Sequence, residues 1–217
     1  MTCLELFAGS RSIGKACDAL GMECFSTDIK QFGGIDLVAD ILTVDIDALP
    51  DAQIIWASPP CTAFSIAAVS SHWKDGKPIS AGAVLGLAIL HKTLQIIEVK
   101  KPAVWFIENP RGMMRKRPEM KYLPRATVTY CQYGDTRMKP TDIWTNCETW
   151  VPRPMCTPGS TCHEAAPRGS KTGTQGLKNN HLRSIIPHAL CMAVMEAAQN
   201  QINETENTAN NRGHLLF

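Results

Sequence analysis

One of the nine cysteines stands in a rigid setting. Cys61 follows two prolines in "SPPC", directly after the apolar stretch "QIIWA". Prolines fix φ and remove backbone donors, so the chain is held firmly just before this thiol. A thiol is a nucleophile only as the thiolate, and it must then point at a substrate from a partly exposed site. A structural cysteine in a strand-end turn is the alternative, and for a lone cysteine it is the preferred one.

A carboxyl group at the end of another predicted strand shifts the preference for Cys61 from a structural to a nucleophilic role. Glu108 follows the apolar stretch "PAVWFI" in "FIENPRG", so it should lie at the end of a buried strand and partly out of water. Such a carboxyl group can hold or donate a proton. Addition to a pyrimidine requires this pair, because a thiolate attacks C6 while an acid protonates or hydrogen-bonds N3. Electron density then builds at C5, which can take a methyl group from a sulfonium donor.

The elements that must position these groups alternate along the chain. Strands alternating with helices indicate α/β architecture with a parallel sheet. The residues of interest fall at the carboxyl ends of strands, where open α/β sheets bind ligands; they are Gly9, Asp28, Asp40, Cys61 and Glu108. We expect strands at 2–9, 22–29, 35–41, 52–60 and 102–110, helices at 10–21, 81–100 and 182–202, and two short strands at 126–134 and 141–146.

The organisation along the chain is predicted in three parts. Residues 1–145 and 181–200 form a catalytic domain, and 146–180 form a small insertion rich in Cys, Gly and Pro that could be a DNA-recognition loop. Residues 201–217 read as a disordered tail. Ser10 or Ser12 is the expected cap of the first helix.

Taken together, the motifs resemble the DNA cytosine-C5 methyltransferase family over about residues 3–145 and 181–198. "LELFAGSRSIG" is similar to the family's first motif, "STDI" and "VADI" to its acidic cofactor motifs, and "LRSIIPHAL" to its last motif. The resemblance implies a Rossmann-like S-adenosylmethionine-dependent methyltransferase fold with a mostly parallel sheet and a small C-terminal insertion. The cofactor it implies is S-adenosylmethionine, held by Phe7, Ala8, Gly9, Ser10, Asp28, Ile29, Asp40, Ile41 and Pro59.

The catalytic roles follow from the same resemblance. "SPPC" resembles the Pro-Cys nucleophile motif and implies attack by Cys61, and "FIENP" resembles the motif that assigns base binding to Glu108. "YGDTRMKPT" resembles the basic motif beside the nucleophile, which implies roles for Arg137 and Lys139. The sequence departs from the family at Pro110, where valine is usual, and it lacks one of the basic residues of the last of these motifs.

The charge distribution points to a polyanionic partner. Residues 100–183 carry 15 Lys or Arg against six Asp or Glu, although the whole chain has a net charge of only +2. A basic face that flanks the proposed pocket would grip phosphates, and the target base would have to leave the stack. The predicted DNA contacts are Arg111, Arg115, Lys116, Arg117, Arg168 and Lys171.

The remaining cysteines favour no metal site. They are scattered and odd in number, and the N-terminus lacks the pattern of a signal peptide, so we expect reduced thiols in the cytoplasm. "CETWVPRPMCTPGSTCH" lacks paired CxxC spacing. A structural zinc ion stays as the less favoured alternative, with ligands Cys147, Cys156, Cys162 and His163.

The sequence therefore predicts a compact, monomeric DNA (cytosine-5-)-methyltransferase without a membrane span, acting on DNA in a bacterial or phage-infected cell. Residues 81–100 are read as a buried helix. Three alternatives stay open: alkylation at C5 of RNA or a nucleotide, a modified donor whose extra carboxylate would use Arg11 and Lys30, and a non-catalytic DNA-binding protein with this fold.

Overall fold

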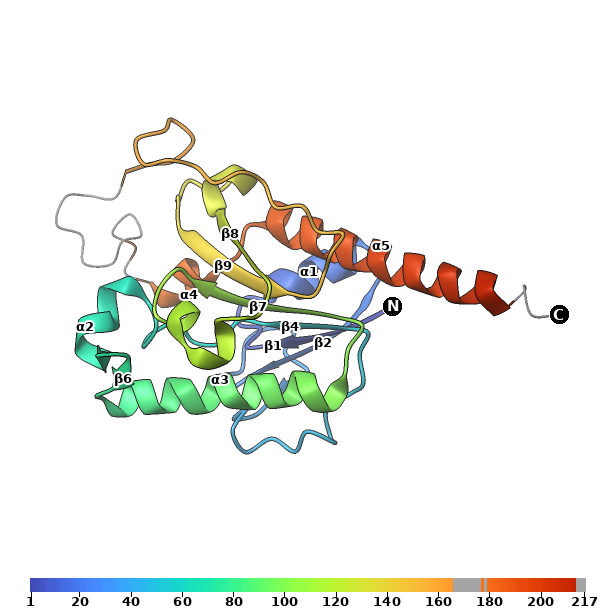
Figure 1. The fold of residues 1–217 in the computed structure, drawn as a ribbon, viewed down its shortest axis with the longest axis horizontal. Coiled ribbons are helices and arrows are strands. Elements are labelled where there is room, and N and C mark those ends of the chain that lie inside the picture. Colours follow the sequence, from blue (N-terminus) through green and yellow to red (C-terminus); the bar gives the residue numbers. More distant parts are fainter. Residues whose placement is uncertain (166–176, 178, 214–217) are drawn as a thin grey trace.

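The computed structural model describes residues 1–165, 177 and 179–213, in which a seven-stranded sheet carries helices on both faces (Figure 1). The strand order is β3-β2-β1-β4-β7-β9-β8. Five strands are parallel: β1 (Thr2–Leu6), β2 (Glu23–Asp28), β3 (Leu37–Val38), β4 (Ile54–Ala57) and β7 (Val104–Pro110). The predicted α/β class with a mostly parallel sheet is confirmed.

Two strands complete one edge of this sheet. β9 (Pro140–Thr145) runs antiparallel to β7, and β8 (Arg125–Thr129) runs antiparallel to β9. β8 therefore points in the same direction as β7. A separate hairpin is formed by β5 (Trp73–Lys74) and β6 (Lys77–Pro78).

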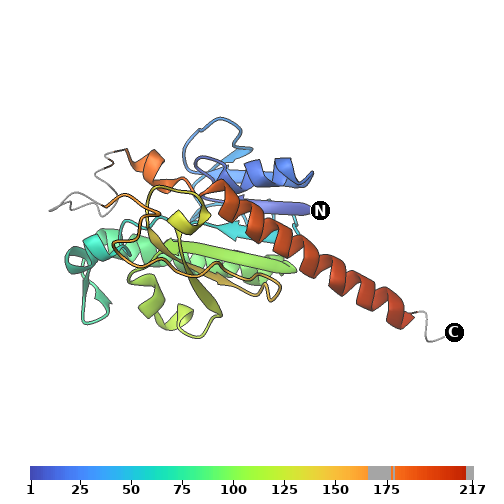
Figure 2. The same ribbon diagram turned by 90° about the horizontal axis from the view of Figure 1, so that it is seen from above.

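The helices divide between the two faces of the sheet (Figures 1 and 2). One face is covered by α1 (Ser12–Ala19) and α5 (His188–Gly213), and the other by α3 (Ala81–Lys100). The shorter elements are α2 (Val69–His72), α4 (Asn180–Ser184) and the 3₁₀ turns η1 (Ile66–Ala68), η2 (Met114–Lys116), η3 (Pro118–Met120) and η4 (Tyr130–Tyr133).

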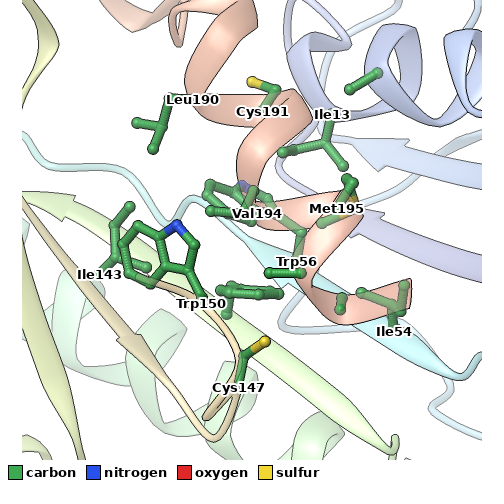
Figure 3. Close-up of a cluster of buried hydrophobic side chains, with 14 of the residues drawn as sticks. Ile13, Ile54, Trp56, Ile143, Cys147, Trp150, Leu190, Cys191, Val194 and Met195 are labelled. Carbon is green, nitrogen blue, oxygen red and sulfur yellow. The ribbon is translucent and has the colours of Figure 1, made fainter. Parts of the chain in front are cut away.

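Successive side chains along the strands point to opposite faces of the sheet and belong to two hydrophobic cores. Ile54 and Trp56 of β4 point towards α1 and α5, where they meet Val194 (Figure 3). Ile55 and Ala57 belong to the core beneath α3. All four side chains are almost fully buried, as expected for a central parallel strand whose side chains alternate between covered faces.

The predicted insertion contributes to the first of these cores. Cys147 and Trp150 are buried there, and the Trp150 ring meets the ring of Phe106 edge-on at 6.3 Å between centroids (Figure 3). The aromatic area of Trp150 therefore anchors the start of this segment to β7.

Helix α3 buries only one face, so the prediction of a buried helix holds for only part of its surface. Leu90 and Ile96 are buried in the core, whereas Val84 and Leu85 are exposed. By length and hydropathy alone α3 could cross a membrane. Here its apolar face packs against the sheet.

The start of α1 differs from its prediction. Arg11 occupies the N-cap position in a left-handed conformation, and no side chain of the cap residue bonds the helix. The buried carboxylate of Glu5 instead accepts hydrogen bonds from the backbone N–H groups of Ile13 (3.0 Å) and Gly14 (3.1 Å). A carboxylate from the neighbouring strand thus satisfies free donors of the helix.

The predicted C-terminal helix and tail also need correction. The expected single helix is interrupted between α4 and α5, and α5 then continues to Gly213, so 201–213 are helical rather than disordered. Extending an existing helix avoids the cost of a new nucleus. The polar part of α5 projects beyond the sheet in Figure 2.

Candidate active site

Sheet topology brings the proposed nucleophile and acid to one edge. Cys61 follows β4, and Glu108 lies near the end of the adjacent parallel strand β7. Because β8 points the same way and β9 runs antiparallel, Tyr130 after β8 and Lys139 before β9 come to the same edge. Four functional groups from distant parts of the sequence therefore meet at the carboxyl end of the sheet.

The loop that carries Cys61 is held in place by bonds along its length. The Asn109 side chain donates to the carbonyl oxygen of Pro59 at 2.8 Å. The Cys61 carbonyl oxygen accepts from the N–H groups of Phe64 (3.0 Å) and Ser65 (2.9 Å), which closes a turn after the thiol. This loop is therefore pre-positioned.

The glycine after "ENPR" allows this loop to meet the segment that follows Glu108. A Cβ atom at Gly112 would lie 2.1 Å from the carbonyl oxygen of Phe64, so only glycine fits. That carbonyl accepts from the N–H of Met113 at 2.7 Å. Sequence reasoning assigned Gly112 no role, because the contact lies between residues far apart in the chain.

Opposing influences act on the thiol. Burial raises the pKa of Cys61, the positive charge of Lys139 lowers it, and the negative charge of Glu108 raises it. Burial in turn lowers the pKa of Lys139, while Glu108 and Cys61 raise it. The mutual effects indicate that the three groups share one electrostatic site, in which Lys139 favours the thiolate.

Glu108 is oriented by a residue that sequence reasoning missed. The buried Tyr130 hydroxyl donates to Glu108 Oε1 at 3.0 Å. Lys139 Nζ lies 3.5 Å from the same hydroxyl and donates to the Arg183 carbonyl oxygen at 3.0 Å. The strand expected over 126–134 hid this role, because β8 ends at Thr129 and so brings Tyr130 to the same edge as the end of β7.

Arg137 lies beside this group, 5.7 Å from the centroid of the Tyr130 ring, and its charge lowers the pKa of Lys139. Its guanidinium forms an ion pair with Asp135 and donates to the carbonyl oxygens of Leu182, Arg183 and Ile185. It holds the segment containing α4 against the turn after η4. These bonds give Arg137 a positioning role, and the catalytic roles expected of Arg137 and Lys139 stay predictions.

A cavity of about 350 Å³ lies beside the nucleophile loop, between the strand ends and α3. The cavity lining includes the exposed apolar side chains of Ile29 and Leu85, which a flat ring would cover. It also includes carboxylate groups. Five of the nine predicted cofactor residues line it, and these are Phe7, Asp28, Ile29, Asp40 and Ile41. This mixture fits a nucleoside-bearing methyl donor.

Gly9 does not line the cavity but belongs to the turn beside it. Gly9 adopts φ 50° and Phe7 φ 60°, so the first turn is held in the left-handed region. Asp28 accepts from the N–H of Gly9 at 3.0 Å. Ala8, Ser10 and Pro59 are not among the lining residues, and Pro60 takes the place of Pro59.

Only part of the basic stretch is free to meet a polyanion. Arg115 forms a bidentate pair with the buried Asp142, and Arg117 stacks 4.9 Å from the Trp73 ring. Both guanidinium groups therefore have partners within the protein, and their contact with DNA stays a prediction. Arg111 and Lys116 are exposed, while Arg168 and Lys171 lie outside the described residues.

The predicted zinc ligands are regrouped. Cys156, Cys162 and His163 come together, but Cys147 is buried in the core and bonds Thr149. The fourth member of the cluster is Cys131 of η4. The spacing around 147–163 could not reveal this member.

Comparison with known proteins gives a consistent match. Residues 1–128 match the family model described as C-5 cytosine-specific DNA methylase. The chain is 32% identical over 162 residues to a probable DNA (cytosine-5)-methyltransferase of Frog virus 3, covering 70% of this chain and 74% of the relative.

Two further similarities are more partial. Type II methyltransferase M.HhaI of Haemophilus parahaemolyticus is 27% identical over 118 residues, covering 50% of this chain and 33% of the relative. A crystal structure of a DNMT2 mutant from Spodoptera frugiperda aligns with a TM-score of 0.43 at 16% identity, covering 69% of this chain and 51% of that one.

Proposed function

Since the chain belongs to the C-5 cytosine-specific DNA methylase family, we propose that it methylates C5 of cytosine in DNA through a covalent bond between Cys61 and C6. The observation that carries this proposal is the shared site of Cys61, Glu108 and Lys139, in which the charge of each of the other two groups acts on the thiol.

The nucleophilic step is assigned to Cys61. Lys139 favours loss of the thiol proton, and the thiolate then adds to C6 of the pyrimidine ring. The rigid loop holds the sulfur in place, because Asn109 bonds the backbone two residues before it. Elimination later restores the C5–C6 double bond and frees the thiolate, after a proton leaves C5.

Base recognition is assigned to Glu108. Its carboxyl group engages N3 of the cytosine and stabilises the charge that develops there on addition. The Tyr130 hydroxyl fixes one carboxyl oxygen, which leaves the other to face the base. Tyr130 is thus a positioning residue.

The methyl donor is assigned to the cavity beside this site. Asp28 and Asp40 offer acceptors for hydroxyl or amine groups, and Ile41 offers an apolar wall. S-adenosylmethionine fits this set and would supply a methyl group on a positively charged sulfur. The cavity lining includes Pro60, so the donor would lie one residue from the nucleophile.

DNA would be gripped next to the site. The exposed Arg111 and Lys116 follow Glu108 in the chain and can contact phosphates on either side of a flipped base. We further propose that the protein acts as a monomer on DNA in the cytoplasm, independently of a membrane.

Covalent trapping tests the proposal. Duplex DNA containing 5-fluorocytosine is incubated with S-adenosylmethionine and the wild-type chain, Cys61→Ala or the control Cys24→Ala, which removes a half-buried thiol on β2. We expect an adduct that survives denaturation with wild type and the control, and none with Cys61→Ala. Because fluorine cannot leave as a proton does, the adduct should persist.

The outcomes separate the alternatives. An adduct formed by Cys61→Ala would refute the assignment of the nucleophile. DNA binding without any adduct, together with failure to bind the donor, would favour a non-catalytic DNA-binding protein. An adduct that forms only with RNA or with a free nucleotide would show that DNA is not the substrate.

A further inference from the structure

Four potential metal ligands converge outside the active site. The thiols of Cys131, Cys156 and Cys162 and the imidazole of His163 all place their ligand atoms within 4.8 Å of one another. Cys131 comes from η4, and the others come from the segment that packs against it. From this convergence we propose a structural zinc site of the Cys₃His type.

The ligand atoms lie close enough together to surround one tetrahedral ion, once the two sulfur atoms of Cys156 and Cys162 move slightly apart. Zinc bonds of about 2.3 Å to sulfur and 2.0–2.1 Å to nitrogen place two sulfurs about 3.8 Å apart and a sulfur and nitrogen about 3.6 Å apart. The observed separations from the Cys156 sulfur are 3.2 Å to the Cys162 sulfur and 3.4 Å to Nδ1 of His163. The Cys162 sulfur lies 3.7 Å from the same nitrogen.

The chemistry of the set also selects zinc. Three thiolates and one imidazole are a common ligand set of closed structural zinc sites. All nine cysteines are free thiols, so each ligand is available. On binding, the thiols release their protons to solvent and the imidazole binds as its neutral form.

The position of the site indicates what the ion would hold together. Around the cluster, the Cys156 N–H bonds Thr129 Oγ1 at 2.9 Å, and the Glu164 N–H bonds the Thr136 carbonyl oxygen at 2.9 Å. The ion would lock residues 156–163 onto η4, whose first residue, Tyr130, orients Glu108. The ion would thus stabilise the position of Tyr130, the hydrogen-bond partner of Glu108.

The cluster predicts a ligand set that differs from the one expected from spacing. Cys147 belongs to the hydrophobic core, and Cys131 replaces it. A second group of three cysteines, Cys3, Cys17 and Cys24, lies on the α1 side of the sheet and provides an internal control.

Metal content and cobalt spectroscopy test the site. The 217-residue chain is purified without chelator, its zinc is measured by mass spectrometry, and the metal-free protein is titrated with Co²⁺. We expect about one zinc ion per chain and visible ligand-field bands of tetrahedral thiolate cobalt. Cys131→Ser and Cys162→Ser should lose both, whereas Cys147→Ser and Cys24→Ser should keep both.

The effect of zinc on stability can also be tested without relying on a substitution that disturbs the core. Cys162 is exposed, so its replacement leaves the packing of the core unchanged. Wild-type protein stripped with a chelator should melt at a lower temperature and recover when zinc is returned. Circular dichroism checks that the secondary structure persists throughout.

Three results would overturn the site. The first is a wild-type chain that holds no zinc and shows no cobalt bands. The second is metal that survives Cys131→Ser but is lost in Cys147→Ser or Cys24→Ser. The third is a disulfide between Cys156 and Cys162 in protein isolated under reducing conditions, seen as a mass lower by two hydrogens.

Discussion

Replacing Arg115 by methionine separates a structural role from a DNA-contacting one. The sequence predicts a phosphate contact, whereas the guanidinium pairs with the carboxylate of Asp142, and its Nε donates at 2.8 Å. Asp142 is fully buried and lies opposite Asn109 in the β7–β9 register. Removing the guanidinium leaves a buried carboxylate on the strand that supports Glu108.

The expected cost follows from this burial. Removing one partner of a buried ion pair costs about 3–5 kcal/mol. The Arg115 side chain is 26% exposed, and Asp142 keeps a hydrogen bond from Thr127 at 2.8 Å and the charge of Arg125 at 3.9 Å, so we expect about 2–4 kcal/mol. For a chain of this size that loss lowers Tm by roughly 5 to 15 °C.

Two measurements on Arg115→Met distinguish the structural role from the DNA-contacting role. Urea unfolding gives the free energy of unfolding, and the salt dependence of DNA affinity gives the number of phosphate contacts. The matched control is Lys116→Met, which removes an exposed charge one residue away. This variant should reduce the magnitude of the slope of log affinity against log salt concentration by about 0.9. It should change the free energy of unfolding by less than about 0.5 kcal/mol.

The reasoning fails if the two variants exchange their behaviour. Arg115→Met with unchanged unfolding and a reduced salt slope would show that the guanidinium contacts DNA rather than Asp142. Adding Asp142→Asn should recover part of the stability lost in Arg115→Met, because the buried carboxylate then no longer depends on the longer 3.9 Å pair with Arg125 alone.

Three further predictions concern the edge of the sheet. Lys139→Met removes the charge that lowers the pKa of Cys61, so the rising limb of the pH–rate profile should move to higher pH; an unchanged limb would contradict their coupling. Tyr130→Phe deletes the hydrogen bond to Glu108, and adduct formation should slow about tenfold or more for a loss of about 1.5–3 kcal/mol, with donor binding, measured by calorimetry, unchanged. Gly112→Ala places a methyl group 2.1 Å from a backbone oxygen and should cost about 1–3 kcal/mol in urea unfolding; wild-type stability would disprove the close contact.

Much of the site could be predicted from local pattern. Apolar runs interrupted by turn residues identify the parallel strands, and the residue types at their carboxyl ends mark the edge where ligands bind. Cys61 and Glu108 lie at the ends of successive predicted strands of this kind, so the sequence predicted that both lie at this edge, whereas the sheet order makes β4 and β7 neighbours. The cofactor turn at Gly9 and Asp28 was visible for the same reason.

Other features depend on contacts between distant residues. Asp142 of β9 pairs with Arg115, and Tyr130 at the end of β8 hydrogen-bonds Glu108. No local spacing encodes these partners, because strand order and direction decide which side chains face each other. The replacement of Cys147 by Cys131 in the cysteine cluster has the same cause, since only packing shows which thiol enters the core and which meets His163.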